Sequence, residues 1–249
     1  MAAPFELTSV VHLVRPAGRH ASNLEELREG IAQSSASSLF GHTLQCQLRH
    51  PAASTLPPDD FSSWVNGVVH DRETAERISF AVQAHGGSPA ELRAALLDLL
   101  GSVPQAQRIE RDAPAEGDFV FLEIESVPVG TGALVEDCDA LVSALAEADP
   151  GVWFYHFIEQ PWLDPHAPSL VDWVRGCGDA RLGEWLEEAM AAGRPLEDTR
   201  RRVVRRWRQS RLGRRVAEAA ADTEHARREA GREAVVGLVR RITRSEDSR

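Results

Sequence analysis

Apolar and polar residues alternate in two stretches of the chain, residues 5–14 and 119–129. A side-chain period of two is typical of an extended strand with one buried face. In the first stretch one face carries Phe5, Leu7, Val11 and Leu13. In the second, Val120, Leu122 and Ile124 alternate with Glu123 and Glu125. We therefore predict two strands, which can pair in a small two-stranded sheet.

Helical spacing dominates the rest of the chain. The predicted N-caps include the pair Ser22-Asn23, either Asp59 or Asp60, and Ser88, which is followed by a proline at the first helical position. The predicted fold class is therefore mainly α with a minor β component.

The order of these elements repeats once along the chain. Around two histidines, Phe40 matches Phe154, His42 matches His156, and Leu44 matches Ile158. Further on, Trp-Val-Asn-Gly at 64–67 matches Trp-Val-Arg-Gly at 173–176. Several matches in one order favour a tandem duplication of a strand-plus-helices unit. We expect the two degenerate copies to be related by a pseudo-twofold axis.

This repeat predicts the organisation of the chain. We call residues 1–103 the N-terminal half and residues 119–212 the C-terminal half. Residues 104–118 form the predicted linker, which is rich in proline, glutamine and charge. Residues 213–249 are expected to form a basic C-terminal helical tail with a weak apolar stripe.

The layout resembles an uncharacterised bacterial family of unknown function. Its pattern has an aromatic-Tyr-His helix, often with an acid three residues later, and then an Asp-Phe-Ser-x-Trp helix start. Phe154-Tyr155-His156 with Glu159 fits the first element, and residues 60–64 fit the second. The N-terminal half departs from the first element, with Gly41 in place of the tyrosine. The resemblance supports the architecture and implies no activity.

Composition narrows the class of protein. Apolar residues make up 43% of the 249 residues and charged residues 27%, as in globular proteins with a real core. No apolar run is long enough to span a membrane, and the N-terminus lacks the pattern of a signal peptide. The three cysteines form no CxxC pair, which favours a reducing compartment. We expect a cytoplasmic protein that does not enter a membrane.

The two histidine helices raise the possibility of a binding site. If they face each other, His42 approaches His156, and Glu159 lies three residues after His156 on the same side of a helix. The candidate ligand-binding residues are His42, His156, Glu159, Tyr155, Trp64 and Trp173. A divalent metal usually needs three or four good ligands, which this set does not clearly supply. The simpler interpretation is that these residues are core anchors, so the sequence assigns neither a metal nor a cofactor.

Charge is distributed unevenly. Residues 1–193 hold 11 arginines against 29 acids, whereas residues 194–249 hold 17 against 9, and the chain has no lysine. An arginine-rich helix can bind phosphates, and its tryptophan can stack on a base. The candidate nucleic-acid-binding residues are Arg201, Arg202, Arg205, Arg206, Arg208 and Trp207. The acidic body can instead hold these arginines, within one chain or across a dimer.

Motifs for the common enzyme classes, such as GxSxG, Walker A or HExxH, do not occur. We therefore expect a non-catalytic binding or scaffold protein of unidentified partner, and a homo-oligomer, most simply a dimer. Two alternatives stay open: nucleic-acid binding through the arginine-rich helix, and a metal or small-molecule site between the histidine helices.

Overall fold

The computed structural model describes residues 3–50, 58–85 and 87–212. The chain forms two compact units, Met1–Val204 and Arg205–Arg249, and each is considered by itself. Both predicted halves, up to Val204, lie in the first unit. The predicted tail, residues 213–249, lies outside the described residues.

The fold is mainly α with one small antiparallel sheet, as predicted. The first half of the chain contains β1 (Phe5–Ala21), α1 (Leu24–Gln33), α2 (Ala36–Thr43), α3 (Cys46–Arg49), α4 (Asp60–Trp64), the π-helical turn η1 (Val65–Val69), α5 (Arg72–His85), α6 (Pro89–Ser102) and α7 (Gln105–Glu110). The second half contains β2 (Phe119–Val135), α8 (Cys138–Glu147), α9 (Pro150–Phe154), the π-helical turn η2 (Tyr155–Glu159), α10 (Gln160–Leu163), α11 (Leu170–Gly176) and α12 (Ala180–Ala191). Residues 196–212 are helical.

Local capping explains where the helices begin. The side chain of Asn23 accepts a hydrogen bond from the backbone N–H of Glu26, and Asp137 caps α8 in the same way. Asp59 caps α4, and Ser88 caps α6 ahead of Pro89. These polar side chains satisfy backbone donors that have no partner within the helix, and the predicted starts of α1, α4 and α6 are confirmed.

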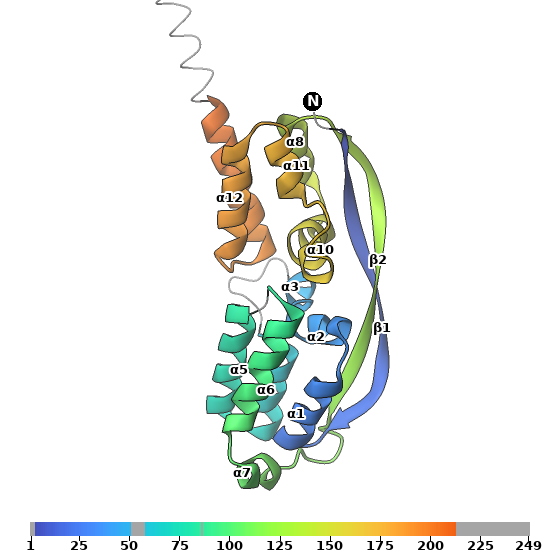
Figure 1. The fold of residues 1–249 in the computed structure, drawn as a ribbon, viewed down its shortest axis with the longest axis vertical. Coiled ribbons are helices and arrows are strands. Elements are labelled where there is room, and N and C mark those ends of the chain that lie inside the picture. The colour runs from blue at the N-terminus through green and yellow to red at the C-terminus, as the bar shows by residue number, and fades with distance from the viewer. Residues whose placement is uncertain (1–2, 51–57, 86, 213–249) are drawn as a thin grey trace, which may run out of the picture. The chain divides into compact units, whose positions relative to one another are not determined.

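Strands β1 and β2 pair along their whole length as a ribbon, which we call the β-ribbon (Figure 1). Each strand has 17 residues, which is longer than the predicted stretches. Phe5 pairs with Val135 at one end and Ala21 pairs with Phe119 at the other. In Figure 1 the described helices of the first unit lie on one side of this ribbon, and none of them lies against its other face.

The register of the β-ribbon is irregular at two places that mirror each other. One irregularity lies between Glu6 and Thr8, and the other between Pro16 and His20. On the longer side of each lies a glycine in the left-handed region, Gly132 with φ 75° and Gly18 with φ 73°. Glycine reaches this region without the steric cost of a Cβ atom. The same backbone solution therefore occurs once in each strand.

Each half packs a helix on the strand of the other half. Helix α2 contacts β2, and α9 contacts β1, whereas α1 and α8 contact the strand that precedes them. The largest fully buried side chains include Trp153, Trp162, Phe40, Phe61, Phe121 and Phe154. The two halves therefore share one core and are not separate globules.

The helical stretch that follows α1 is divided. His42, Cys46 and Arg49 have helical spacing in the sequence, but α2 ends at Thr43 and α3 begins at Cys46. Among the described residues, no helix is both long enough and apolar enough to cross a membrane.

Candidate functional site

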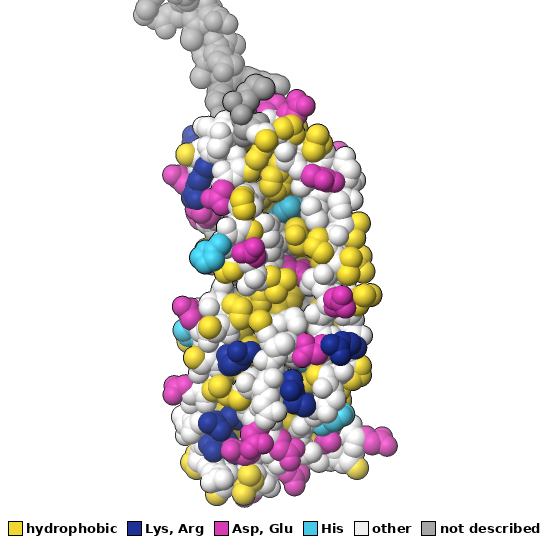
Figure 2. All heavy atoms as spheres, turned by 45° about the vertical axis from the view of Figure 1, so that its right-hand side comes forward, with side chains coloured by type: hydrophobic (Ala, Val, Ile, Leu, Met, Phe, Trp, Pro, Cys, Tyr) yellow, Lys and Arg dark blue, Asp and Glu magenta, His cyan; other side chains and the backbone are white. Residues whose placement is uncertain are grey.

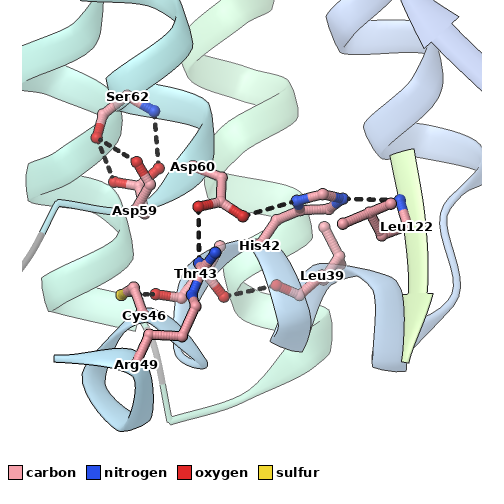
Figure 3. Close-up of polar contacts among 9 residues, drawn as sticks. All are labelled: Leu39, His42, Thr43, Cys46, Arg49, Asp59, Asp60, Ser62 and Leu122. Carbon is pink, nitrogen blue, oxygen red and sulfur yellow. Dashed lines mark hydrogen bonds and ion pairs between the residues drawn. The ribbon is translucent and has the colours of Figure 1, made fainter. Parts of the chain in front are cut away.

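His42 is a buried histidine whose two ring nitrogens both have partners (Figure 3). Its Nε2 accepts a hydrogen bond of 2.9 Å from the backbone N–H of Leu122 in β2. Because a backbone N–H can only donate, the ring proton of neutral His42 is on Nδ1. Nδ1 lies 3.1 Å from Asp60 Oδ2, so it donates to that carboxylate. Neither nitrogen is left to act as a catalytic base.

Asp60 is held between two donors. Arg49 Nη2 donates to its other oxygen, Oδ1, at 2.8 Å. Burial alone would raise the pKa of Asp60, but the hydrogen bond from His42 and the guanidinium of Arg49 outweigh it and lower the pKa below its ordinary value. The carboxylate is therefore charged at neutral pH and orients the ring of His42, as Figure 3 shows.

His156 binds the backbone of the other strand in the same way. Its Nε2 accepts a hydrogen bond of 2.9 Å from the N–H of Thr8 in β1. Thr8 is the fourth residue of β1, and Leu122 is the fourth residue of β2. Each histidine thus satisfies a donor on the outer edge of the strand from the opposite half, where no further strand is available to accept it.

Two tryptophans make a second matched pair of contacts. The indole N–H of Trp64 donates to the carbonyl of Gly117, and that of Trp173 donates to the carbonyl of Ala3. Both acceptors lie two residues before the strand of the opposite half. The predicted residues His42, His156, Trp64 and Trp173 are therefore reciprocal attachments of helices to strands.

The structure does not bring His42 and His156 together. The backbone partner of His42 is Leu122, and that of His156 is Thr8. Leu122 pairs with Pro16, which lies eight positions after Thr8 in β1, or about 26 Å along a strand. No group of three His, Cys, Asp or Glu side chains in the described part of the chain is arranged to hold a metal ion. The two histidines therefore do not face each other, because each one binds near a different end of the β-ribbon.

Glu159 does not pair with His156 either. Its carboxylate is fully buried and lies 2.9 and 3.1 Å from Nε2 of His12, at the middle of β1. His156 and Glu159 lie in the π-helical turn η2, where hydrogen bonds run from residue i to i+5. Residues three apart on such a turn no longer share a face as they do on an α-helix. Sequence reasoning missed His12, because nothing in the order of residues connects it to Glu159.

Tyr155 and His156 lie in different environments. The ring of Tyr155 contacts that of His156 at a centroid distance of 5.1 Å. Burial, and then the charge of Glu159, raise the pKa of Tyr155. Burial lowers the pKa of His156 to about 4, although the neighbouring side chain of Gln160 acts in the opposite direction. His156 is therefore neutral at physiological pH.

The arginine-rich segment is divided between the two units. In the first unit, Arg201 forms an ion pair with Glu197, and Arg202 forms one with Asp198. Arg205, Arg206, Trp207 and Arg208 belong to the second unit, in the helical stretch that ends at residue 212 of the described chain. The candidate nucleic-acid-binding residues are therefore divided between the two units.

Comparisons with known proteins agree with this fold. The model of a family of unknown function, DUF5752, matches residues 2–207. A solved structure, "The structure of OrfY from Thermoproteus tenax", superimposes with a TM-score of 0.65 at 23% identity, covering 82% of this chain and 93% of that one. No curated protein matches the sequence. At this identity the structural likeness concerns the fold alone.

Proposed function

We propose a function for this chain, which belongs to the DUF5752 family of unknown function: it is a non-catalytic docking protein that binds a second copy of itself through the outer face of the β-ribbon. The observation that carries the proposal is the exposure of apolar side chains on that face. Val11 and Leu13 are 54% and 55% exposed, and Val127 and Val129 of the neighbouring strand are also exposed.

These side chains lie on one face of the ribbon. Val11 pairs directly with Val127, and residues paired across a ladder point to the same side. Their neighbours Val10 and Ile124 point the other way and are buried under the helices. Figure 2, which brings the ribbon side of Figure 1 forward, shows hydrophobic side chains gathered on this face. Contiguous apolar surface of this kind marks interaction sites in soluble proteins.

A second copy suits the face because an exposed sheet face packs well on another sheet. Arg15 lies opposite Glu123 of β2, and Arg19 forms an ion pair with Glu123, so these charges are balanced within one chain and the apolar side chains carry the association. Two ribbons stacked face to face about a twofold axis bring the same apolar residues of both copies together. The interface is then isologous, as in most homodimers.

Both site histidines support a non-catalytic role. Their Nε2 atoms accept backbone hydrogen bonds, so neither offers that nitrogen to a substrate. The nucleic-acid alternative is the weaker one, because Arg201 and Arg202 already pair with acidic residues. The bacterial and cytoplasmic setting is part of the proposal; it rests on the motif resemblance and on three cysteines that are free thiols.

Sedimentation of the full-length protein tests this proposal. The wild type is expected at twice 27.4 kDa, and Leu13→Arg is expected to weaken the dimer about 30-fold or more, as loss of a central interface anchor does. The matched control is Phe80→Arg on α5, because Phe80 is 73% exposed and lies away from the ribbon. A wild type that stays monomeric, or a dimer that only the Phe80 variant dissociates, contradicts the proposal.

A further inference from the structure

Two of the three cysteines lie against each other in the second half of the chain. Burial raises the pKa of Cys138 to about 12, and the neighbouring thiol of Cys177 raises it further, by its charge and through a side-chain hydrogen bond. Cys138 is 9% exposed, and Cys177 is half-buried. The third thiol, Cys46, is buried in α3 of the first half. The second half therefore contains a pair of neighbouring thiols that its histidine and tryptophan contacts do not use.

The path of the backbone independently brings these two positions together. Cys138 is the first residue of α8, three residues after Val135, which pairs with Phe5 across the β-ribbon. The backbone N–H of Cys177 donates to the carbonyl of Trp173, and the ring of Trp173 contacts that of Phe5 at a centroid distance of 5.5 Å. In Figure 1, α8 and α11 lie together at the end of the β-ribbon where β1 begins. The start of α8 and the end of α11 thus meet around Phe5.

Apolar residues take the corresponding places in the first half. Leu24 follows the cap of α1 as Cys138 follows the cap of α8. Val69 lies just after the Trp-Val-Asn-Gly segment that matches the segment before Cys177. Leu24 and Val69 are both buried and line one cavity, so the repeated fold brings these positions together in each half. The fold does not require a thiol at either position, and the cysteine pair adds a chemistry that the first half lacks.

Neighbouring thiols can be joined by a sulfur–sulfur bond when their side chains already point toward each other. We propose that Cys138 and Cys177 are a redox pair, which a small disulfide such as glutathione disulfide oxidises to an intramolecular disulfide bond. This bond connects the start of α8 to the end of α11 and stabilises that end of the second half. In a reducing compartment such a bond is transient and responds to the supply of oxidant. The proposal does not depend on dimerisation through the β-ribbon.

The exposure of the two thiols determines the order of the steps. Cys177 is the more accessible, so its thiolate attacks one sulfur of glutathione disulfide and releases a glutathione thiolate, which takes up the proton lost by Cys177. The Cys138 sulfur then attacks the Cys177 sulfur of this mixed disulfide, and the proton of Cys138 passes to the departing glutathione. Two protein thiols are oxidised, and one glutathione disulfide is reduced to two glutathione molecules. Because the pKa of Cys138 is raised, its thiolate is scarce and the second step is the slower one.

Incubation of the full-length protein with glutathione disulfide, followed by mass spectrometry of the denatured chain, tests this proposal. The wild type is expected to lose two hydrogen atoms and to keep one free thiol. After digestion, the segments that contain Cys138 and Cys177 are expected as one linked peptide. Closing a loop of roughly 40 residues is expected to raise the midpoint of thermal unfolding by about 5–15 °C, and a reducing agent is expected to reverse this rise.

Three alanine variants separate the two steps and control for the third thiol. Cys138→Ala is expected to stop at the mixed disulfide, with one glutathione on Cys177, whereas Cys177→Ala is expected to stay unmodified. Cys46→Ala is the matched control, because Cys46 is also a buried cysteine but lies in the first half, and it is expected to form the bond as the wild type does. The proposal is overturned if the wild type keeps three free thiols, if its reaction ends with glutathione on Cys177, or if the bond joins two chains or includes Cys46.

Discussion

The N-terminal and C-terminal halves use a histidine for the same contact but complete its surroundings differently. His42 and His156 both accept the N–H of the fourth residue of the opposite strand. Among the described residues, a carboxylate lies on the other nitrogen of His42 but not on that of His156. The fold requires the shared contact, because it gives a hydrogen-bond acceptor to a backbone N–H on the outer edge of each strand. The fold does not require the same partner for Nδ1 of both histidines, since the surroundings of that atom differ between the halves.

Replacing each histidine by an apolar residue of similar size should give the largest contrast. His42→Leu removes the acceptor for Leu122 and a donor to Asp60, and is expected to lower the free energy of unfolding by about 3–5 kcal/mol. His156→Leu removes the acceptor for Thr8 but also eliminates an unpartnered polar atom, so we expect a loss of about 1–2 kcal/mol. Urea unfolding of both variants measures the difference. Equal losses, or a greater loss at His156, would mean that Nδ1 of His156 is not short of a partner.

The pH dependence of stability should identify His156 separately. Its pKa is about 4 in the folded protein and 6.5 ordinarily, so between these values the unfolded chain binds more protons than the folded one. Stability is then fully present above pH 6.5 and is lost as the pH falls toward 4, by on the order of 3 kcal/mol. Denaturant unfolding at pH 7 and pH 4.5 measures this loss. In His156→Leu the slope between these values should decrease by about one proton, whereas an unchanged slope would assign the effect to another group.

Local features of this fold were predictable from the sequence, and contacts between the halves were not. The cap at Ser88 was predicted, and those at Asn23 and Asp59 were each predicted to within one residue, because a cap depends on residues within one turn of helix. The strands were predicted too short, since beyond Val14 and Val129 the ribbon is largely exposed and carries proline, glycine and arginine. Alternation disappears where neither face is buried.

The sequence singled out candidate residues but not the groups that they contact. The repeat identified both histidines and both tryptophans. Their partners, however, are backbone groups outside the half that carries them, and a backbone group cannot be recognised from the type of its residue. The pair of His12 with Glu159 depends on a π-helical turn that changes which side chains share a face. Spacing rules for an α-helix therefore assigned Glu159 to the wrong histidine.

The tryptophan contacts offer a smaller contrast between the halves. Trp64→Phe and Trp173→Phe each remove an indole N–H and keep an aromatic ring. The bond of Trp64 to Gly117 is partly buried, and its loss is expected to cost about 1–1.5 kcal/mol. The bond of Trp173 to Ala3 is exposed, so water replaces it and the expected cost is about 0.5 kcal/mol. Thermal unfolding of the two variants compares these costs. A greater loss of stability in Trp173→Phe than in Trp64→Phe would contradict the expectation that the partly buried bond contributes more.

The two glycines of the ribbon should behave alike, and this is the smallest effect. Gly18 and Gly132 have nearly the same positive φ, and a Cβ atom added to either meets no atom within 4 Å. Alanine at each position is therefore opposed only by backbone strain, expected to cost about 1 kcal/mol. Urea unfolding of Gly18→Ala and Gly132→Ala tests the equality, with Gly67→Ala as a control in open space but without a positive φ. Because no neighbouring side chain takes part, equal costs would support a shared backbone geometry in the two strands. A difference of more than about 1 kcal/mol would show that the two irregularities resemble each other in register but not in energy.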